Sequence, residues 1–257
     1  MTPRSPFAER AAGELPFVWA HRGASALAPE NTIEAFVLAG ELGADGIELD
    51  VQLDANGVAV VCHELYLFAL EDRLYLHDPG GGRPVAVAQL ETATLGSGVF
   101  FPDGSRHPIA RFDEALEAIA PSQWLDIELK AGGTYDPRLS DVVVRALMAR
   151  AERTLFSSFD HVVLAELAQR APEIPRAVLC DARLRDPTVL LAGVGAHMWN
   201  LRRANCTRSD VASWRSADIA ICLYGNEVTF DLPDLCSWPV SGLFLDDPRL
   251  EMALARY

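Results

Sequence analysis

Ionisable side chains gather at the ends of three apolar segments that have the composition of buried strands. They are His21, Arg22, Glu48, Asp50, Glu128 and Lys130. Because residues two apart on a strand face the same way, Glu48 lies beside Asp50, and Glu128 beside Lys130. Three carboxylates in one place repel one another unless a cation holds them, and their oxygens suit Mg²⁺ or Ca²⁺ better than zinc. We therefore expect a divalent metal site; pairing of Glu48 and Asp50 with rim arginines is the alternative.

Two histidines adjoin these carboxylates. His21 closes the first segment, and an Asn-Gly turn at 56–57 folds His63 back against the second segment, 46–51. Such a pair offers a general acid and a general base near neutral pH, which phosphodiester cleavage requires together with Arg22 and a metal ion. The remaining histidines are expected to be structural or solvated: His77, His107, His161 and His197.

Lys130 is the only lysine in a chain whose other basic residues are all arginine. The exception indicates a site that needs a compact ammonium instead of a planar guanidinium. The alternative is a rim lysine that was retained by chance and is solvated beside Glu128.

The composition limits the classes of protein to which the chain can belong. The chain has 257 residues, of which 50% are hydrophobic, so it can bury a large core. Its formal net charge of −14 repels phosphate backbones and anionic bilayers, so we expect neither nucleic-acid binding nor stable membrane association. Charged residues interrupt the first twenty positions, and the five cysteines form no C-x-x-C pair. These features favour a cytoplasmic protein with reduced thiols and leave its oligomeric state open.

Strand-like segments alternate with helical patterns along the chain. The expected strands are 17–20, 46–51, 124–129, 154–159, 176–180, 196–201, 218–224 and 241–246. The expected helices are 31–42, 112–119, 138–151, 161–170, 187–192 and 210–214. Alternation predicts a parallel sheet of the α/β class, and eight strands predict a closed (β/α)8 TIM barrel. We expect a single domain over 1–257.

Two segments depart from this alternation. Only seven residues separate Asp50 from Val58, too few for a parallel crossover, so 58–62 is expected to form a β-hairpin with the second strand. The stretch from about 64 to 108 has weak periodicity and many glycines and prolines, which predicts an inserted loop subdomain. Because functional loops of TIM barrels follow the carboxyl ends of strands, this insertion is a candidate lid.

Five sequence blocks are distributed over most of the chain. They are HRGASALAPENTIEAF (21–36), GADGIELDVQLDANGVAVVCHE (43–64), LDIELK (125–130), SSF (157–159) and SGLFLDDP (241–248). In these blocks and their order the chain resembles the glycerophosphodiester phosphodiesterases, which are phospholipase-C-like TIM barrels. The first two blocks together are highly specific.

The resemblance implies hydrolysis of glycerophosphodiesters, small-molecule substrates, to sn-glycerol 3-phosphate and an alcohol. It gives acid and base roles to His21 and His63, and phosphate contacts to Arg22 and Lys130. The divalent metal, Mg²⁺ or Ca²⁺, would be bound by Glu48, Asp50 and Glu128. Asn31 would orient Arg22 or a metal ligand, or else cap a helix.

Two blocks depart from the family pattern. After the second histidine the chain reads ELYLFALEDRLYLHDPGGGRP (64–84) instead of leading through paired threonines, and LYGNEV (223–228) replaces W-T-V-N but retains Asn226. Both changes fall on substrate-contacting regions. The sequence therefore defines the reaction better than it defines which alcohol is released from the substrate. The alternatives are a lipid-directed phospholipase D or sphingomyelinase-D-like enzyme, and a barrel that binds glycerophosphodiesters without cleaving them.

Overall fold

A closed barrel of parallel strands forms the body of the protein. A computed structural model describes residues 6–7, 15–131, 136–147 and 150–249. The barrel strands are β1 (Phe17–Ala20), β2 (Gly46–Leu53), β9 (Trp124–Leu129), β10 (Thr154–Ser158), β11 (Arg176–Leu179), β12 (Met198–Arg202), β13 (Ala220–Tyr224) and β14 (Gly242–Leu245). Each pairs in parallel with its neighbours, and β1 pairs with both β14 and β2, which closes the ring. The predicted (β/α)8 barrel is confirmed.

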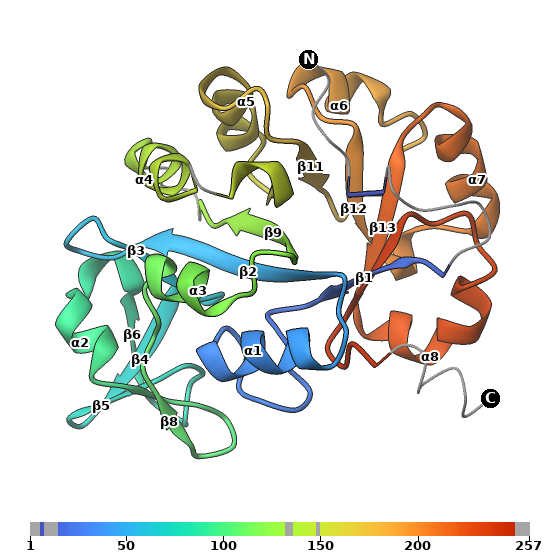
Figure 1. Ribbon diagram of the computed structural model, residues 1–257. Helices are drawn as coiled ribbons and strands as arrows, with labels where there is room; N and C mark the ends of the chain where they lie inside the picture. The colour runs from blue at the N-terminus through green and yellow to red at the C-terminus, as the bar shows by residue number, and fades with distance from the viewer. Residues whose placement is uncertain (1–5, 8–14, 132–135, 148–149, 250–257) are drawn as a thin grey trace.

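Helices surround the barrel on its outer side (Figure 1). They are α1 (Ile33–Glu41), α3 (Phe112–Ala118), α4 (Arg138–Ala146), α5 (His161–Arg170), α6 (Thr188–Gly193), α7 (Arg208–Ser216) and α8 (Asn226–Leu235), with short 3₁₀ turns at Ala151–Arg153 and Arg203–Asn205. Sequence patterns missed α8 because Pro233 lies inside it and marks a break by the usual rules. Among the described residues, no helix is long and apolar enough to cross a membrane.

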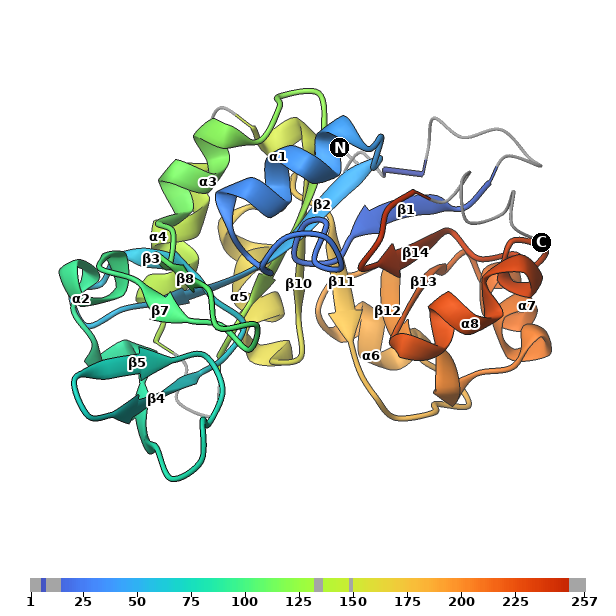
Figure 2. The ribbon, with the colours of Figure 1, turned by 90° about the horizontal axis from the view of Figure 1, so that it is seen from below.

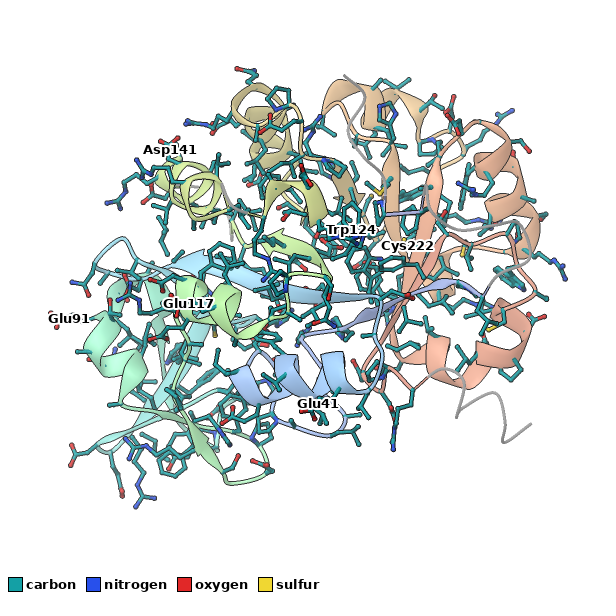
Figure 3. The ribbon with its side chains drawn as sticks, viewed as in Figure 1. Glu41, Glu91, Glu117, Trp124, Asp141 and Cys222 are labelled. Atoms are coloured by element: carbon teal, nitrogen blue, oxygen red, sulfur yellow. The ribbon has the colours of Figure 1, made fainter. Side chains whose placement is uncertain are left out.

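Alternate residues of the strands serve two different cores. On β2, Ile47 and Leu49 face outward and pack in one cluster with Phe36 of α1 and Phe112 of α3. The inward positions of several strands form a separate cluster that includes Trp19, and Trp124 and Cys222 lie at the centre of the ring (Figure 3). A Cβ at Gly46 would lie 2.4 Å from the Trp19 ring, so this position requires glycine. The strand period therefore directs Glu48 and Asp50 into the barrel.

The predicted hairpin follows β2 directly. β3 (Ala59–Val61) pairs antiparallel with β2 and places Val61 opposite Val51. At the turn, Gly57 has a φ of +75°, and Asp54 Oδ1 accepts hydrogen bonds from two backbone N–H groups. This turn brings His63 back to the mouth of the barrel.

The insertion is a folded subdomain and not a set of loops. Its strands are β4 (Tyr66–Leu70), β5 (Arg73–Tyr75), β6 (Arg83–Ala86), β7 (Val99–Phe100) and β8 (Arg106–His107), in the order β6-β4-β5-β7-β8. It also contains the 3₁₀ turn Val87–Gln89 and α2 (Thr92–Gly96). The sequence did not predict these strands because strands of two to five residues, one carrying Pro84, are too short to show a period.

The insertion has its own core and a defined place beside the barrel. Leu67, Leu95 and Phe101 are among the buried side chains that pack there with Val60 and Cys62 of the hairpin. In both ribbon views the insertion lies on the side of the barrel away from α7 and α8 (Figures 1 and 2). Hairpin and insertion thus form one continuous wall at that side.

Candidate active site

The three predicted metal-binding carboxylates meet inside the barrel. Strand register places Asp50 of β2 opposite Glu128 of β9, and Glu48 lies two residues before Asp50 on the same face. One carboxylate oxygen from each residue lies within 4.8 Å of the others. Glu48 and Asp50 are 4% and 1% exposed. The structure therefore brings these residues together as the sequence predicted.

Asn31 holds one of these carboxylates in place. Its Nδ2 donates to Asp50 Oδ2 at 2.8 Å, and its Oδ1 accepts from the Asp50 backbone N–H at 3.3 Å. The helix cap of α1 is the neighbouring Thr32, whose Oγ1 accepts from the Ala35 backbone N–H. The capping alternative for Asn31 was wrong, and Asn31 instead orients Asp50.

Arg22 contacts the cluster through both its backbone and its side chain. Its backbone, at a φ of +56°, donates its N–H to Glu48 Oε2 at 2.8 Å. Its guanidinium donates to both oxygens of Glu30 at 3.0 Å, and its Nε lies 3.5 Å from Asp50 Oδ2. A left-handed conformation costs energy for a residue with a side chain, which indicates that the site imposes it. Sequence reasoning missed Glu30, because a bond within a loop leaves no periodic signal.

Lys130 lies inside the cluster instead of on the rim. Its Nζ is 2.6 Å from Glu128 Oε1 and 3.0 Å from Asp50 Oδ1, and its side chain is 12% exposed. The solvated-rim alternative was therefore wrong. Its ammonium bridges two of the three carboxylates.

Each predicted catalytic histidine is paired with a carboxylate at Nδ1. His21 Nδ1 lies 2.7 Å from Asp246 Oδ1, just beyond the end of β14, and His63 Nδ1 lies 2.9 Å from Glu64 Oε1. Such pairing fixes the ring and leaves Nε2 to exchange protons. Sequence reasoning assigned no role to Asp246 or Glu64, although both lie in the quoted motif blocks.

The charges of the cluster shift its titration. Burial, followed by the charges of Asp50 and Glu128, raises the pKa of Glu48 well above its usual range. Burial also raises the pKa of Glu128, although Lys130 opposes the shift. Burial pushes the pKa of Asp50 upward too, but the charges of Lys130 and Arg22 outweigh it, so that pKa falls below its usual range. The pKa values of Glu48 and Glu128 are thus raised although Arg22 and Lys130 act against the shifts.

A cavity of about 180 Å³ lies at the mouth of the barrel. His21, Arg22, Glu48, His63 and Glu128 contribute its ionisable side. The remaining lining residues are the largely apolar set Phe159, Leu179, Tyr224, Gly225 and Phe244, together with the polar Ser157 and Asn200. Asn226, singled out in the sequence, begins α8 and is not among the described lining residues. A ligand in this cavity would meet both ionic groups and apolar side chains.

Comparison with known proteins identifies the family. Residues 21–250 match the glycerophosphoryl diester phosphodiesterase family. The chain belongs to this family. A glycerophosphodiester phosphodiesterase of Caldanaerobacter subterraneus subsp. tengcongensis is 31% identical over 245 residues, which cover 93% of this chain and 97% of that protein. Membership in the family makes this chain an enzyme, a phosphoric diester hydrolase.

Solved structures of glycerophosphodiester phosphodiesterases and related enzymes show the same fold. A putative glycerophosphoryl diester phosphodiesterase from Silicibacter pomeroyi has a TM-score of 0.82 at 23% identity, with 96% of this chain and 95% of that chain covered. A phosphodiesterase of Oleispira antarctica, solved with its product sn-glycerol-3-phosphate, has a TM-score of 0.79 at 23% identity, with 94% and 97% covered. The barrel is therefore common to these proteins.

Proposed function

We propose that the chain hydrolyses glycerophosphodiesters to sn-glycerol 3-phosphate and an alcohol, using a divalent cation held by Glu48, Asp50 and Glu128. The observation that carries the proposal is that two carboxylate-paired histidines line the same cavity as Glu48 and Glu128, which cluster with the buried Asp50. The related Oleispira antarctica phosphodiesterase, with sn-glycerol-3-phosphate bound as product, supports the choice of product. Mg²⁺ and Ca²⁺ both suit the ligands.

The carboxylates fit a hard cation. Asp50 Oδ1 is buried, and the partner described for it is the Lys130 ammonium at 3.0 Å. Glu48 and Glu128 resist ionisation in this arrangement, so a cation would stabilise their charged forms. When bound, it would supply electrostatic stabilisation of charge on the phosphate and a contact for a glycerol hydroxyl.

In the proposed reaction, one histidine removes the proton of a glycerol hydroxyl, whose oxygen attacks phosphorus. The other histidine donates a proton to the leaving alcohol as its bond to phosphorus breaks. Water then opens the cyclic phosphate, with the histidines returned to their starting protonation. Direct attack by water is the alternative route. In either, Arg22 and Lys130 stabilise the phosphate charge.

The deciding experiment is a hydrolysis assay with and without metal. We expect release of sn-glycerol 3-phosphate from a glycerophosphodiester with Mg²⁺ or Ca²⁺, and loss of turnover in excess EDTA that added metal restores. Glu48→Gln should weaken binding of Mg²⁺ or Ca²⁺ in calorimetric titration and leave the circular dichroism spectrum unchanged. Full turnover in EDTA would exclude the metal-dependent mechanism, and binding of the diester without hydrolysis would favour the non-catalytic barrel.

A lipid-directed activity is a second candidate. The apolar residues that line the cavity include Phe159, which is 48% exposed, and Val162 nearby in sequence is 62% exposed. An acyl chain attached to the glycerol would find hydrocarbon contacts there. Equal kcat/KM for a lysophospholipid and its deacylated glycerophosphodiester would favour this activity.

A further inference from the structure

A second and larger cavity adjoins the catalytic one. It has a volume of about 350 Å³ and lies between the loop after β1, residues 25–30, and the insertion. His77 and Asp103 are among the insertion residues that line it. Cavities that bury small organic ligands measure about 300–1,000 Å³, so the catalytic cavity alone is small for a whole phosphodiester, and the two together are adequate.

Two contacts join the cavities. Arg22 lines the catalytic cavity, and its guanidinium is bonded to Glu30, which lines the second cavity. On the other side, His63 lines the catalytic cavity, and its partner Glu64 Oε1 lies 3.6 Å from His77 Nε2, in the second. A phosphate held by Arg22 between the histidines would therefore have one ester arm beside the second cavity.

The second cavity is acidic. Its lining includes the carboxylates Glu30 and Asp103, and no lysine or arginine is among its described lining residues. Arg22 neutralises Glu30, whereas Asp103 accepts hydrogen bonds only from its neighbour Ser105 in the contacts described and keeps a charge that faces solvent. Such a lining repels an anionic group and accepts a neutral or cationic one.

We propose that this second cavity receives the leaving alcohol and selects alcohols without an anionic group over alcohols that carry one, such as a carboxylate. The inference rests on the proposed function, since it assigns the alcohol half of the same substrate. It gives the insertion a part in specificity through His77 and Asp103. The glycerol half would then occupy the catalytic cavity.

The first test compares three diesters of sn-glycerol 3-phosphate, with methanol, ethanolamine and serine as the alcohol. Release of sn-glycerol 3-phosphate is the readout for all three. The serine ester differs from the ethanolamine ester by one added carboxylate, so kcat/KM should be about tenfold higher for the ethanolamine ester. Equal kcat/KM values for these two esters would overturn the charge selection.

The second test changes the cavity itself. Asp103→Asn removes a charge and retains an oxygen for the Ser105 N–H, and it should lower the ethanolamine-to-serine ratio about threefold, as expected of one exposed charge pair. The matched control is Asp186→Asn, because Asp186 bonds Thr188 in the same way but is not among the cavity residues. An unchanged ratio in Asp103→Asn, or an equal fall in the control, would overturn the assignment.

A third variant tests whether the alcohol occupies the second cavity. Ala28 lines the cavity and is half-buried. Ala28→Phe should lower kcat/KM for the ethanolamine ester about tenfold more than for the methyl ester, because the methyl group is too small to need the cavity. An equal effect on both esters would overturn the location. If the unaltered protein hydrolyses none of the three esters, the proposed function itself fails, which is distinct from hydrolysis without discrimination.

Discussion

The two histidine–carboxylate pairs have nearly the same geometry but are built in different ways. His63 takes its partner Glu64 from the adjacent position, whereas His21 takes Asp246 from a position 225 residues away. The second carboxylate is also contacted by Ser25 Oγ at 3.2 Å. The same chemical unit can thus arise from local chain geometry or from closure of the barrel. Loss of the histidine should therefore affect activity alike in the two pairs. Disturbance of β1 or β14, the strands that close the barrel, should affect the two pairs differently.

The largest expected effect comes from removing either imidazole. His21→Ala and His63→Ala should each lower kcat about 10²- to 10⁴-fold, with substrate affinity changed less, because each loses one proton transfer. Steady-state kinetics on a glycerophosphodiester measures this. More than half of the original turnover in either variant would remove that histidine from the acid–base pair.

Removing the partner charge should have a smaller effect. Asp246→Asn and Glu64→Gln should each lower kcat about 10- to 100-fold, because a neutral amide neither fixes the histidine tautomer nor stabilises the imidazolium. The matched control for Asp246 is the next residue, Asp247→Asn, which loses a pair with Arg249 instead of with a histidine. A kcat in Asp246→Asn equal to that of the control would show that the long-range pair has no part in proton transfer.

Lys130→Arg tests the cluster that both histidine pairs share. A planar guanidinium cannot replace an ammonium placed 2.6 Å and 3.0 Å from two carboxylates, so we expect kcat/KM to fall at least about tenfold, roughly 1.4 kcal/mol. Thermal stability should stay unchanged. Kinetics equal to those of the unaltered protein would remove Lys130 from the substrate.

The smallest expected effect is on stability in acid. The hydrogen bond from the paired histidine is the first cause that lowers the pKa of both Asp246 and Glu64. A lowered carboxylate pKa stabilises the fold above the unfolded pKa of about 4, and this stabilisation is lost as pH falls through the folded value. Asp246→Asn and Glu64→Gln should therefore lower the Tm at pH 7 more than at pH 3. A constant difference in Tm would contradict these pKa directions.

The barrel and the carboxylates could be predicted because each has a local signal. Strands such as β2 and β9 are apolar runs interrupted only by inward charges, and alternation alone sets which residues share a face. The hairpin that returns His63 is encoded in one Asn-Gly turn. Local patterns of this kind locate residues along the chain and on a face.

The rest depends on contacts that no short window contains. The His21–Asp246 pair exists only because β14 closes against β1, and the Arg22–Glu30 pair depends on a left-handed loop conformation. The strands of the insertion are too short for a period, and the core that stabilises them includes Val60 and Cys62 of the hairpin. Such features follow from tertiary packing, which overrides local propensity.

The pairing of β1 with β14 sets the order in which the parts of the active site come together during synthesis. The His21 backbone N–H donates to Leu245 O, and its ring contacts Asp246, so the last barrel strand completes the environment of a residue near the start of the chain. Glu64 leaves the ribosome immediately after His63, whereas Asp246 follows His21 by 225 residues. A nascent chain can therefore form the His63 pair early but cannot complete the His21 pair until β14 has been synthesised, which delays a complete active site until the barrel closes.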